Sequence, residues 1–176
     1  MRLQISRYLC ALPNTHKSYI LKLLDKPSFR GLMPLFEKIL VPLDGSEHSL
    51  HALEKAVQIA KKFDGKITLI HVYSAAWLIS KPRELTILPK LIEEAREAGN
   101  DILADGEKKV KAEGVEVKTL LREGHTVGEI LKTCREGKFD LVVMGARGLS
   151  MIKEILLGSV SHGVTRHTRC PVLVVK

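Results

Sequence analysis

The stretch K-I-L-V-P-L-D-G-S, residues 38–46, begins with a short apolar run and ends in a polar turn. An apolar run of this length is typical of a strand buried inside a sheet. An apolar stripe with helical spacing follows at Leu53, Ala56, Val57, Ala60 and Phe63. Gly65 then stands where a helix often ends on a glycine. The stretch therefore predicts a buried strand that leads through a turn into a helix.

The same alternation continues to the last residues of the chain. Apolar runs predict further strands at residues 66–72, 115–121, 140–145 and 171–175, and apolar stripes predict helices at residues 91–113, 126–137 and 159–167. Strands that alternate with helices form a parallel sheet with helices on both faces, and nearly all-apolar strands are buried on both faces. We therefore expect an α/β fold with a single doubly wound, five-stranded parallel sheet, in a domain spanning residues 36–176.

Residues 1–35 have a different composition. They contain six lysines and arginines against a single aspartate, include three prolines, and show no sustained periodicity. They lack the long apolar core and the small-residue cleavage site of a secretory signal. Three interpretations stay open: an accessory segment, a leader similar to an organelle transit peptide, or residues upstream of a true start at Met33. We expect a basic N-terminal extension that is an appendage to the main domain.

Composition limits the classes of partner. The chain has 176 residues, of which 45% are hydrophobic and 27% are charged, which is ordinary for a globular protein. No apolar run approaches the roughly 18 residues that a membrane span needs. The net charge of +8 comes mostly from the N-terminal extension, and aromatic residues are not interleaved with basic ones as on a nucleic-acid-binding surface. We expect neither a membrane nor a nucleic acid as partner.

The cysteines and histidines do not predict a catalytic or metal site. Cys10, Cys134 and Cys170 are scattered and form no C-x-x-C pair, which favours free thiols in a reducing compartment and predicts a cytoplasmic protein. Cys134 falls on a helical apolar stripe and Cys170 precedes the last strand, so both are expected to be structural. The seven histidines show no metal-ligand spacing, and the nucleophile elbow G-x-S-x-G is absent.

Polar residues and glycines follow several of the predicted strands. In a doubly wound sheet, a ligand binds beyond the carboxyl ends of the strands, at the point where the strand order reverses. Asp44 follows the first strand, where it is suited to accept hydrogen bonds from ribose hydroxyls. Gly145 and Gly148 follow the fourth strand, where positive φ angles would let a polyphosphate approach the bare backbone. These positions predict a nucleotide at one edge of the sheet.

The segment G-A-R-G-L-S-M-I-K-E-I-L-L-G-S-V-S, residues 145–161, matches neither the Walker P-loop nor the dinucleotide-binding turn. Gly158 precedes the last predicted helix, and Ser159 is expected at the N-cap of that helix, where free N–H groups and the helix dipole favour an anion. Arg147 and Lys153 are candidates for positive charge near a phosphate. The segment therefore predicts two half-sites that meet one phosphate chain.

Several of these stretches together resemble one known family. K-I-L-V-P-L-D-G-S, I-H-V, V-M-G-A-R-G, G-S-V-S and C-P-V-L-V-V resemble, in order and position, the universal stress protein family, over about residues 36–176. The spacing G-x2-G-x9-G-S is similar to the signature of its ATP-binding branch. The N-terminal extension has no counterpart in that resemblance.

The resemblance implies a fold, a ligand and a partner. It implies the strand order 3-2-1-4-5, ATP or a related adenine nucleotide, Mg²⁺ or Mn²⁺ on the phosphates, and a homodimer formed through the last strand, 171–175. An apolar edge strand also favours pairing on general grounds, because soluble proteins avoid such exposed edges. Adenine and ribose are implied near Pro42, Asp44, Val72 and Met144. The phosphates are implied over Gly145, Arg147, Gly148, Gly158, Ser159, Val160 and Ser161.

Two functions of different classes remain. The first is an ATP-binding, dimeric stress-response or regulatory protein with slow or partner-dependent hydrolysis at most, because no general base is evident beside the phosphates. The second is a nucleotide-free dimeric interaction module of the same fold. An adenylating enzyme is disfavoured, since such enzymes need a loop like S-G-G-x-D-S where this chain has D-G-S-E-H-S, residues 44–49. The sequence leaves open which adenine nucleotide binds and which pathway is served.

Overall fold

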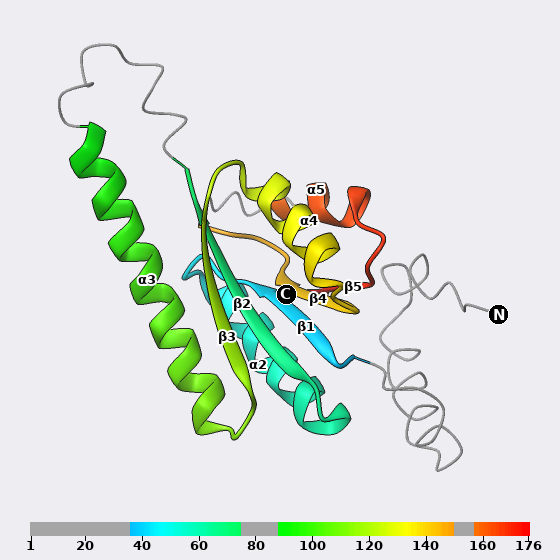
Figure 1. Ribbon diagram of the computed structural model, residues 1–176. Helices are drawn as coiled ribbons and strands as arrows, with labels where there is room; N and C mark the ends of the chain where they lie inside the picture. Colours follow the sequence, from blue (N-terminus) through cyan, green and yellow to red (C-terminus); the bar gives the residue numbers. More distant parts are fainter. Residues whose placement is uncertain (1–35, 75–87, 150–156) are drawn as a thin grey trace, which may run out of the picture.

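The computed structural model describes residues 36–74, 88–149 and 157–176 (Figure 1). Residues 1–35, on which the N-terminal extension falls, lie outside the described part. The elements in chain order are β1 (Lys38–Pro42), α2 (Glu47–Phe63), β2 (Lys66–Tyr73), α3 (Leu88–Ala112), β3 (Val117–Glu123), α4 (Thr126–Gly137), β4 (Leu141–Gly145), α5 (Ser159–His167) and β5 (Val172–Val175). Among the described helices, none is long and apolar enough to span a membrane.

The five strands form one parallel sheet in the order β3-β2-β1-β4-β5, which confirms the predicted architecture. β1 lies in the centre, where Ile39 pairs with Ile67 of β2 on one side and with Leu141 of β4 on the other. The chain runs outward from β1 to β2 and β3, and later returns to place β4 on the opposite side of β1. The strand order therefore reverses between β1 and β4, where their carboxyl ends are neighbours.

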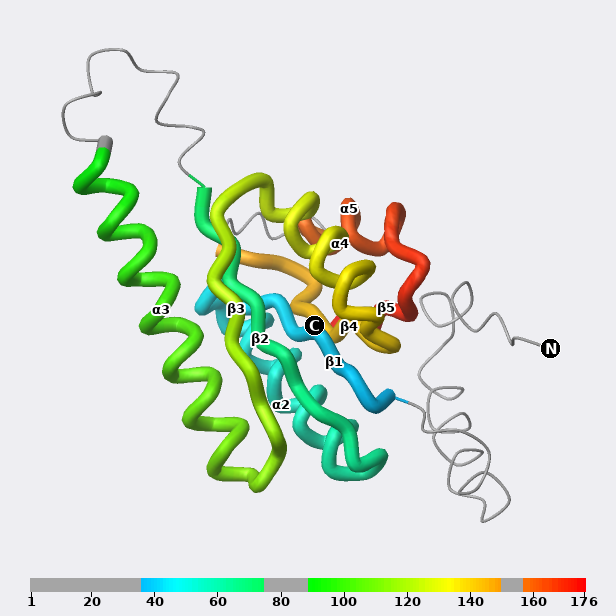
Figure 2. The backbone as a smooth tube through the Cα atoms, in the orientation of Figure 1, coloured from blue at the N-terminus to red at the C-terminus, as the bar shows by residue number. Residues whose placement is uncertain are grey.

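Helices cover both faces of the sheet (Figure 2). α2 and α3 pack on one face, over a core that includes Ile39, Val41 and Val143. α4 and α5 pack on the other face, over Leu40, Val142 and Met144. Because successive side chains of a strand point to opposite faces, β1 and β4 contribute to both cores in alternation. This is the doubly wound arrangement that the sequence predicts.

Two local expectations are wrong. β3 begins two residues later than predicted and is not buried on both faces: Lys118, Thr119 and Arg122 are exposed, because β3 is an edge strand with solvent on one side. The residue in left-handed conformation after α2 is Asp64, with φ 54°, and not Gly65. The missing side chain of Gly65 instead leaves room for the carbonyl oxygen of Phe36, which a Cβ there would overlap.

Candidate functional site

Asp44 is held in place by the turn between β1 and α2. Its Oδ1 accepts hydrogen bonds from the backbone N–H of Ser46 at 3.0 Å and from the Ser46 hydroxyl at 2.5 Å. Ser46 is the N-cap of α2, and its Oγ accepts from the Ser49 N–H. The preceding carbonyl, of Leu43, lies 2.7 Å from Nδ1 of His71 on β2. Asp44 is therefore oriented by fixed neighbours, with Oδ2 on the side of Gly148, which follows β4.

The end of β4 reaches Asp44 through Gly148. A Cβ added to Gly148 would overlap Oδ2 of Asp44, so these two residues are in direct contact. Gly145, by contrast, packs under the start of α2: a Cβ there would lie 2.8 Å from the carbonyl carbon of His48 and 2.9 Å from its oxygen. The prediction that Asp44 lies beside the glycines after the fourth strand is confirmed for Gly148. The sequence does not show that Gly145 makes room for a helix.

The conformation predicted for these glycines is wrong. Among the described glycines, Gly45, Gly114 and Gly124 have positive φ, whereas Gly145 and Gly148 do not. Gly158 has φ −68° and ψ 162°, an ordinary extended conformation. What Gly148 contributes is therefore space beside a carboxylate rather than access to the left-handed region.

The two predicted half-sites are joined at the backbone carbonyl of Ala146. This oxygen accepts from the Gly158 N–H at 2.7 Å and from the Ser161 hydroxyl at 2.8 Å. The Ser161 hydroxyl also lies 3.0 Å from the Gly158 carbonyl, and the Ser161 residue is only 2% exposed. We call this arrangement of Ala146, Gly158 and Ser161 the clasp. It fixes the start of α5 against the end of β4, although residues 150–156, including Lys153, lie outside the described part.

The N-terminus of α5 differs in detail from the prediction. The N-cap is Gly158, which makes no side-chain cap, and Ser159 is the first helical residue, with an exposed side chain. The reason is that the backbone bond from Gly158 to Ala146 sets the helix start one residue earlier. The first bond within the helix runs from the His162 N–H to the Gly158 carbonyl, at 2.9 Å. The N–H groups of Ser159, Val160 and Ser161 precede it, in the positions that attract anions.

Arg147 brings an unsatisfied donor to the same place. It lies between Ala146 of the clasp and Gly148, and its side chain is half-buried. Within the described part of the chain, its Nε is the buried side-chain nitrogen or oxygen that has no hydrogen-bond partner. A buried N–H without a partner costs free energy, and an anion is the acceptor that a guanidinium binds best.

The apolar residues implied for the adenine end share one face of the sheet. Strand alternation directs Pro42, Val72 and Met144 toward α4 and α5, as it does Leu40 and Ile70. Met144 is 4% exposed, so it contributes a wall rather than an open surface. Val72 and Val160 pack at the margin of the same core. The predicted base and phosphate residues are thus contributed by the ends of β1, β2 and β4 and the start of α5.

Sequence reasoning missed three residues of this site. Ser46 holds Asp44, the His48 backbone sets the need for Gly145, and the Ala146 carbonyl joins the half-sites. The serine before the helical stripe could have been recognised as an N-cap. The other two act through backbone atoms, which residue identity does not reveal. The described residues contain no group of three or more His, Cys, Asp and Glu side chains that could hold a metal ion.

Comparison with known proteins agrees with this geometry. The profile of the universal stress protein family matches residues 35–176. The universal stress protein MJ0531 of Methanocaldococcus jannaschii is 38% identical over 144 residues, which cover 81% of this chain and 83% of that protein. The solved structure of protein MJ0577 is 33% identical with a TM-score of 0.67, and covers 81% of this chain and 96% of that one.

A further solved structure is a universal stress protein in complex with cAMP. It is 30% identical, has a TM-score of 0.59, and covers 80% of this chain and 97% of that one. The family profile matches the part of the chain that contains all five strands, and MJ0531 is 38% identical over 81% of the chain. The chain therefore belongs to the universal stress protein family.

Proposed function

We propose that this protein is a cytoplasmic, dimeric stress-response or regulatory protein that binds ATP or a close adenine nucleotide between the end of β1 and the start of α5. The observation that most supports this proposal is the clasp, which brings the free N–H groups of an α-helix to the carboxyl end of β4. The related structure in complex with cAMP is evidence that the fold can bind an adenine nucleotide.

The proposed roles follow from position. The phosphates accept from the first-turn N–H groups of α5 and from Arg147, whose buried Nε gains the acceptor that it lacks. Oδ2 of Asp44 accepts from a ribose hydroxyl, since Oδ1 is already bonded to Ser46. Gly148 and Gly158 keep the path to the backbone free of side chains, while Gly145 lets the start of α2 pack against the end of β4. Pro42, Val72 and Met144 form the apolar wall beside the base.

Hydrolysis is expected to be slow. α5 has no acidic residue in its first turn, and Arg147 stands beside Gly148, so the described residues offer no evident base beside the phosphates. A divalent ion, Mg²⁺ or Mn²⁺, would be bound through phosphate oxygens, because the described residues offer no cluster of metal ligands. A partner protein would then distinguish the nucleotide-bound form of this protein from the empty form.

Titration calorimetry with ATP and Mg²⁺ tests the proposal. Asp44→Asn keeps an oxygen for Ser46 but removes the charge, and we expect a loss of about 1–3 kcal/mol in binding free energy, as for a hydrogen bond to a charged group. Gly158→Val fills the space between Ala146 and Ser161, and should abolish binding. Asp101→Asn, on the exposed side of α3, is the matched control and should bind like the wild type.

Two results would contradict the proposal. One is a dissociation constant above the millimolar range. The other is an affinity that Gly158→Val and Asp44→Asn both leave unchanged in a folded protein. Either would favour the nucleotide-free interaction module instead. Mass spectrometry of the ligand released from the purified protein would identify which nucleotide is bound.

A further inference from the structure

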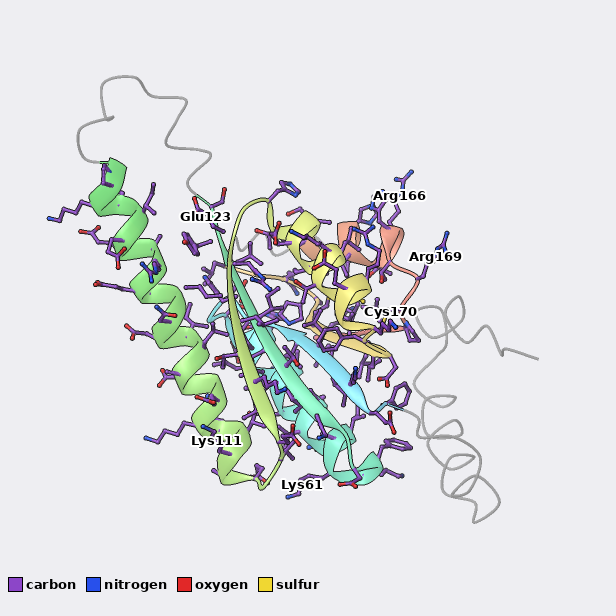
Figure 3. The ribbon with its side chains drawn as sticks, viewed as in Figure 1. Lys61, Lys111, Glu123, Arg166, Arg169 and Cys170 are labelled. Carbon is purple, nitrogen blue, oxygen red and sulfur yellow. The ribbon has the colours of Figure 1, made fainter. Side chains whose placement is uncertain are left out.

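Two cysteines that the nucleotide proposal does not use lie together at the amino-terminal edge of the sheet. Cys134 is in the last turn of α4, and Cys170 is in the connection from α5 to β5, where Figure 3 labels it. Both sulfurs are free thiols. Both residues belong to the same apolar core beneath α4 and α5, in which Cys134 is 5% exposed and Cys170 is half-buried. The two cysteines therefore come from segments that are distant along the chain, the end of α4 and the connection before β5.

Thr168 places the two cysteines relative to each other. Its hydroxyl oxygen lies 3.8 Å from Sγ of Cys134 and accepts from the backbone N–H of Cys170 at 3.0 Å. A single hydroxyl thus contacts the sulfur of one cysteine and the backbone of the other. This contact holds the backbone of Cys170 beside the last turn of α4, in the same core as the Cys134 sulfur.

We propose that Cys134 and Cys170 form a peroxide-sensitive pair that closes to an intramolecular disulfide between α4 and the start of β5. The chemistry needs one peroxide as oxidant. The Cys134 thiolate attacks one oxygen of hydrogen peroxide, the O–O bond breaks, the leaving hydroxide takes a proton to become water, and Cys134 becomes a sulfenic acid. The Cys170 sulfur, after losing its proton, attacks the Cys134 sulfur, and the S–O bond breaks to release a second water. Two thiols and one peroxide thus give one disulfide and two waters.

The electrostatics of the pair assign the attacking sulfur. Interaction with the Cys170 thiol, and then with the Thr168 hydroxyl, lowers the pKa of Cys134 to about 7, against the effect of burial. The pKa of Cys170 is raised by its interaction with Cys134, by burial and by the negative charge of Asp140 at the start of β4. Cys134 is therefore the thiolate near neutral pH, and Cys170 is the resolving thiol.

Peptide mapping tests the pair directly. The full chain is treated with equimolar hydrogen peroxide at pH 8, blocked with iodoacetamide under denaturing conditions, and digested with trypsin. We expect the peptides T-C-R, residues 133–135, and C-P-V-L-V-V-K, residues 170–176, to be recovered linked, with a mass about 2 Da below the sum of the reduced peptides. Cys10→Ser should give the same linked peptides, whereas Cys134→Ser and Cys170→Ser should give none.

The pH dependence separates this pair from ordinary thiols. Because interaction with the Cys170 thiol lowers the pKa of Cys134, oxidation of Cys134 to the sulfenic acid should reach its full rate at a lower pH than oxidation of an ordinary cysteine thiol, whose pKa is about 8.5. Thr168→Val removes the hydroxyl that lowers this pKa, and should move the midpoint of this pH dependence to higher pH.

Three results would overturn the proposal. One is the recovery of Cys134 and Cys170 as separately alkylated peptides after peroxide treatment of a folded protein. A second is a linkage to Cys10 instead. The third is a sulfinic acid on Cys134 without any linked peptide, which would show that Cys170 cannot reach it.

Discussion

At the scale of single residues, the glycines near the site have different neighbours. Gly145 packs against the backbone of His48, and Gly148 faces the carboxylate of Asp44. A Cβ added at Gly158 would lie at ordinary contact distance, 3.4 Å, from the Ala146 carbonyl oxygen. A Cβ introduced at Gly145 would meet rigid backbone, and one at Gly148 would meet a carboxylate that can rotate. A Cβ at Gly158 would make an ordinary contact and need no adjustment of its neighbours. The same residue type therefore has structural importance at Gly145 and, under our proposal, ligand-related importance at Gly148 and Gly158.

We predict that Gly145→Ala destabilises the fold more than Gly158→Ala. The new Cβ at Gly145 must displace the start of α2, and overpacking of this kind costs about 1–3 kcal/mol in the free energy of unfolding. Gly158→Ala meets no close neighbour, and as an N-cap change should cost less than about 1 kcal/mol. Urea denaturation of the two variants and the wild type measures the difference. Equal losses would contradict the assignment of Gly145 to helix packing.

The spacing of these glycines is visible in the sequence, but their purposes are not. The motif could be located because G-x2-G-x9-G-S is a pattern of residue types. Whether a missing Cβ admits a ligand or a helix depends on what packs there, and at Gly145 the neighbour comes from α2, far away along the chain. The spacing of the glycines therefore predicts where the site lies, but it does not predict the role of each glycine.

At the scale of elements, the clasp is the contact that positions α5. Strands and helices were predictable because apolar periodicity follows from burial on a two-faced sheet. The start of α5 was not, because a serine after a glycine suggests a side-chain cap, whereas here a bond from the Gly158 N–H to the Ala146 carbonyl defines the start. A tertiary hydrogen bond overrides the local capping preference at this helix.

We predict that, of the two serines at the start of α5, Ser161 contributes to stability and Ser159 does not. Ser161→Ala removes a buried hydroxyl that donates to Ala146, and should lower the free energy of unfolding by about 1 kcal/mol. Ser159→Ala changes an exposed side chain without a cap bond, and should alter stability by less than about 0.5 kcal/mol. Thermal melts followed by circular dichroism measure both.

Nucleotide affinity completes the comparison of the two serines. If the Ser159 hydroxyl donates to a phosphate, Ser159→Ala should weaken ATP binding despite its unchanged stability. If Ser159→Ala is destabilised and Ser161→Ala is as stable as the wild type, then Ser159 rather than Ser161 anchors the helix. That result would contradict the role of the clasp.

At the scale of the whole molecule, β5 is an edge strand with one side of its backbone unpaired within the described chain. The carbonyl of Pro171 accepts from the N–H of Val142 in β4, and the carbonyl of Val175 accepts from the N–H of Ala146, which follows β4. Alternation along the strand then directs the N–H and C=O groups of Val172 and Val174 away from β4. The side chains of β5 pack into both cores, so what this edge offers to a second copy is chiefly backbone.

We predict that Val174→Pro separates a dimer paired through β5 without unfolding the subunit. Proline removes the outward N–H of Val174, and edge strands tolerate proline where that N–H does not bond within the sheet. Val174→Thr keeps both the N–H and the β-branched shape and is the matched control. Light scattering after size exclusion should give twice 19.6 kDa for the wild type and for Val174→Thr, and 19.6 kDa for Val174→Pro.

A wild-type monomer at micromolar concentration would reject the dimer. A Val174→Pro dimer with native circular dichroism would move the interface to another surface, because pairing along β5 needs the N–H that this variant lacks.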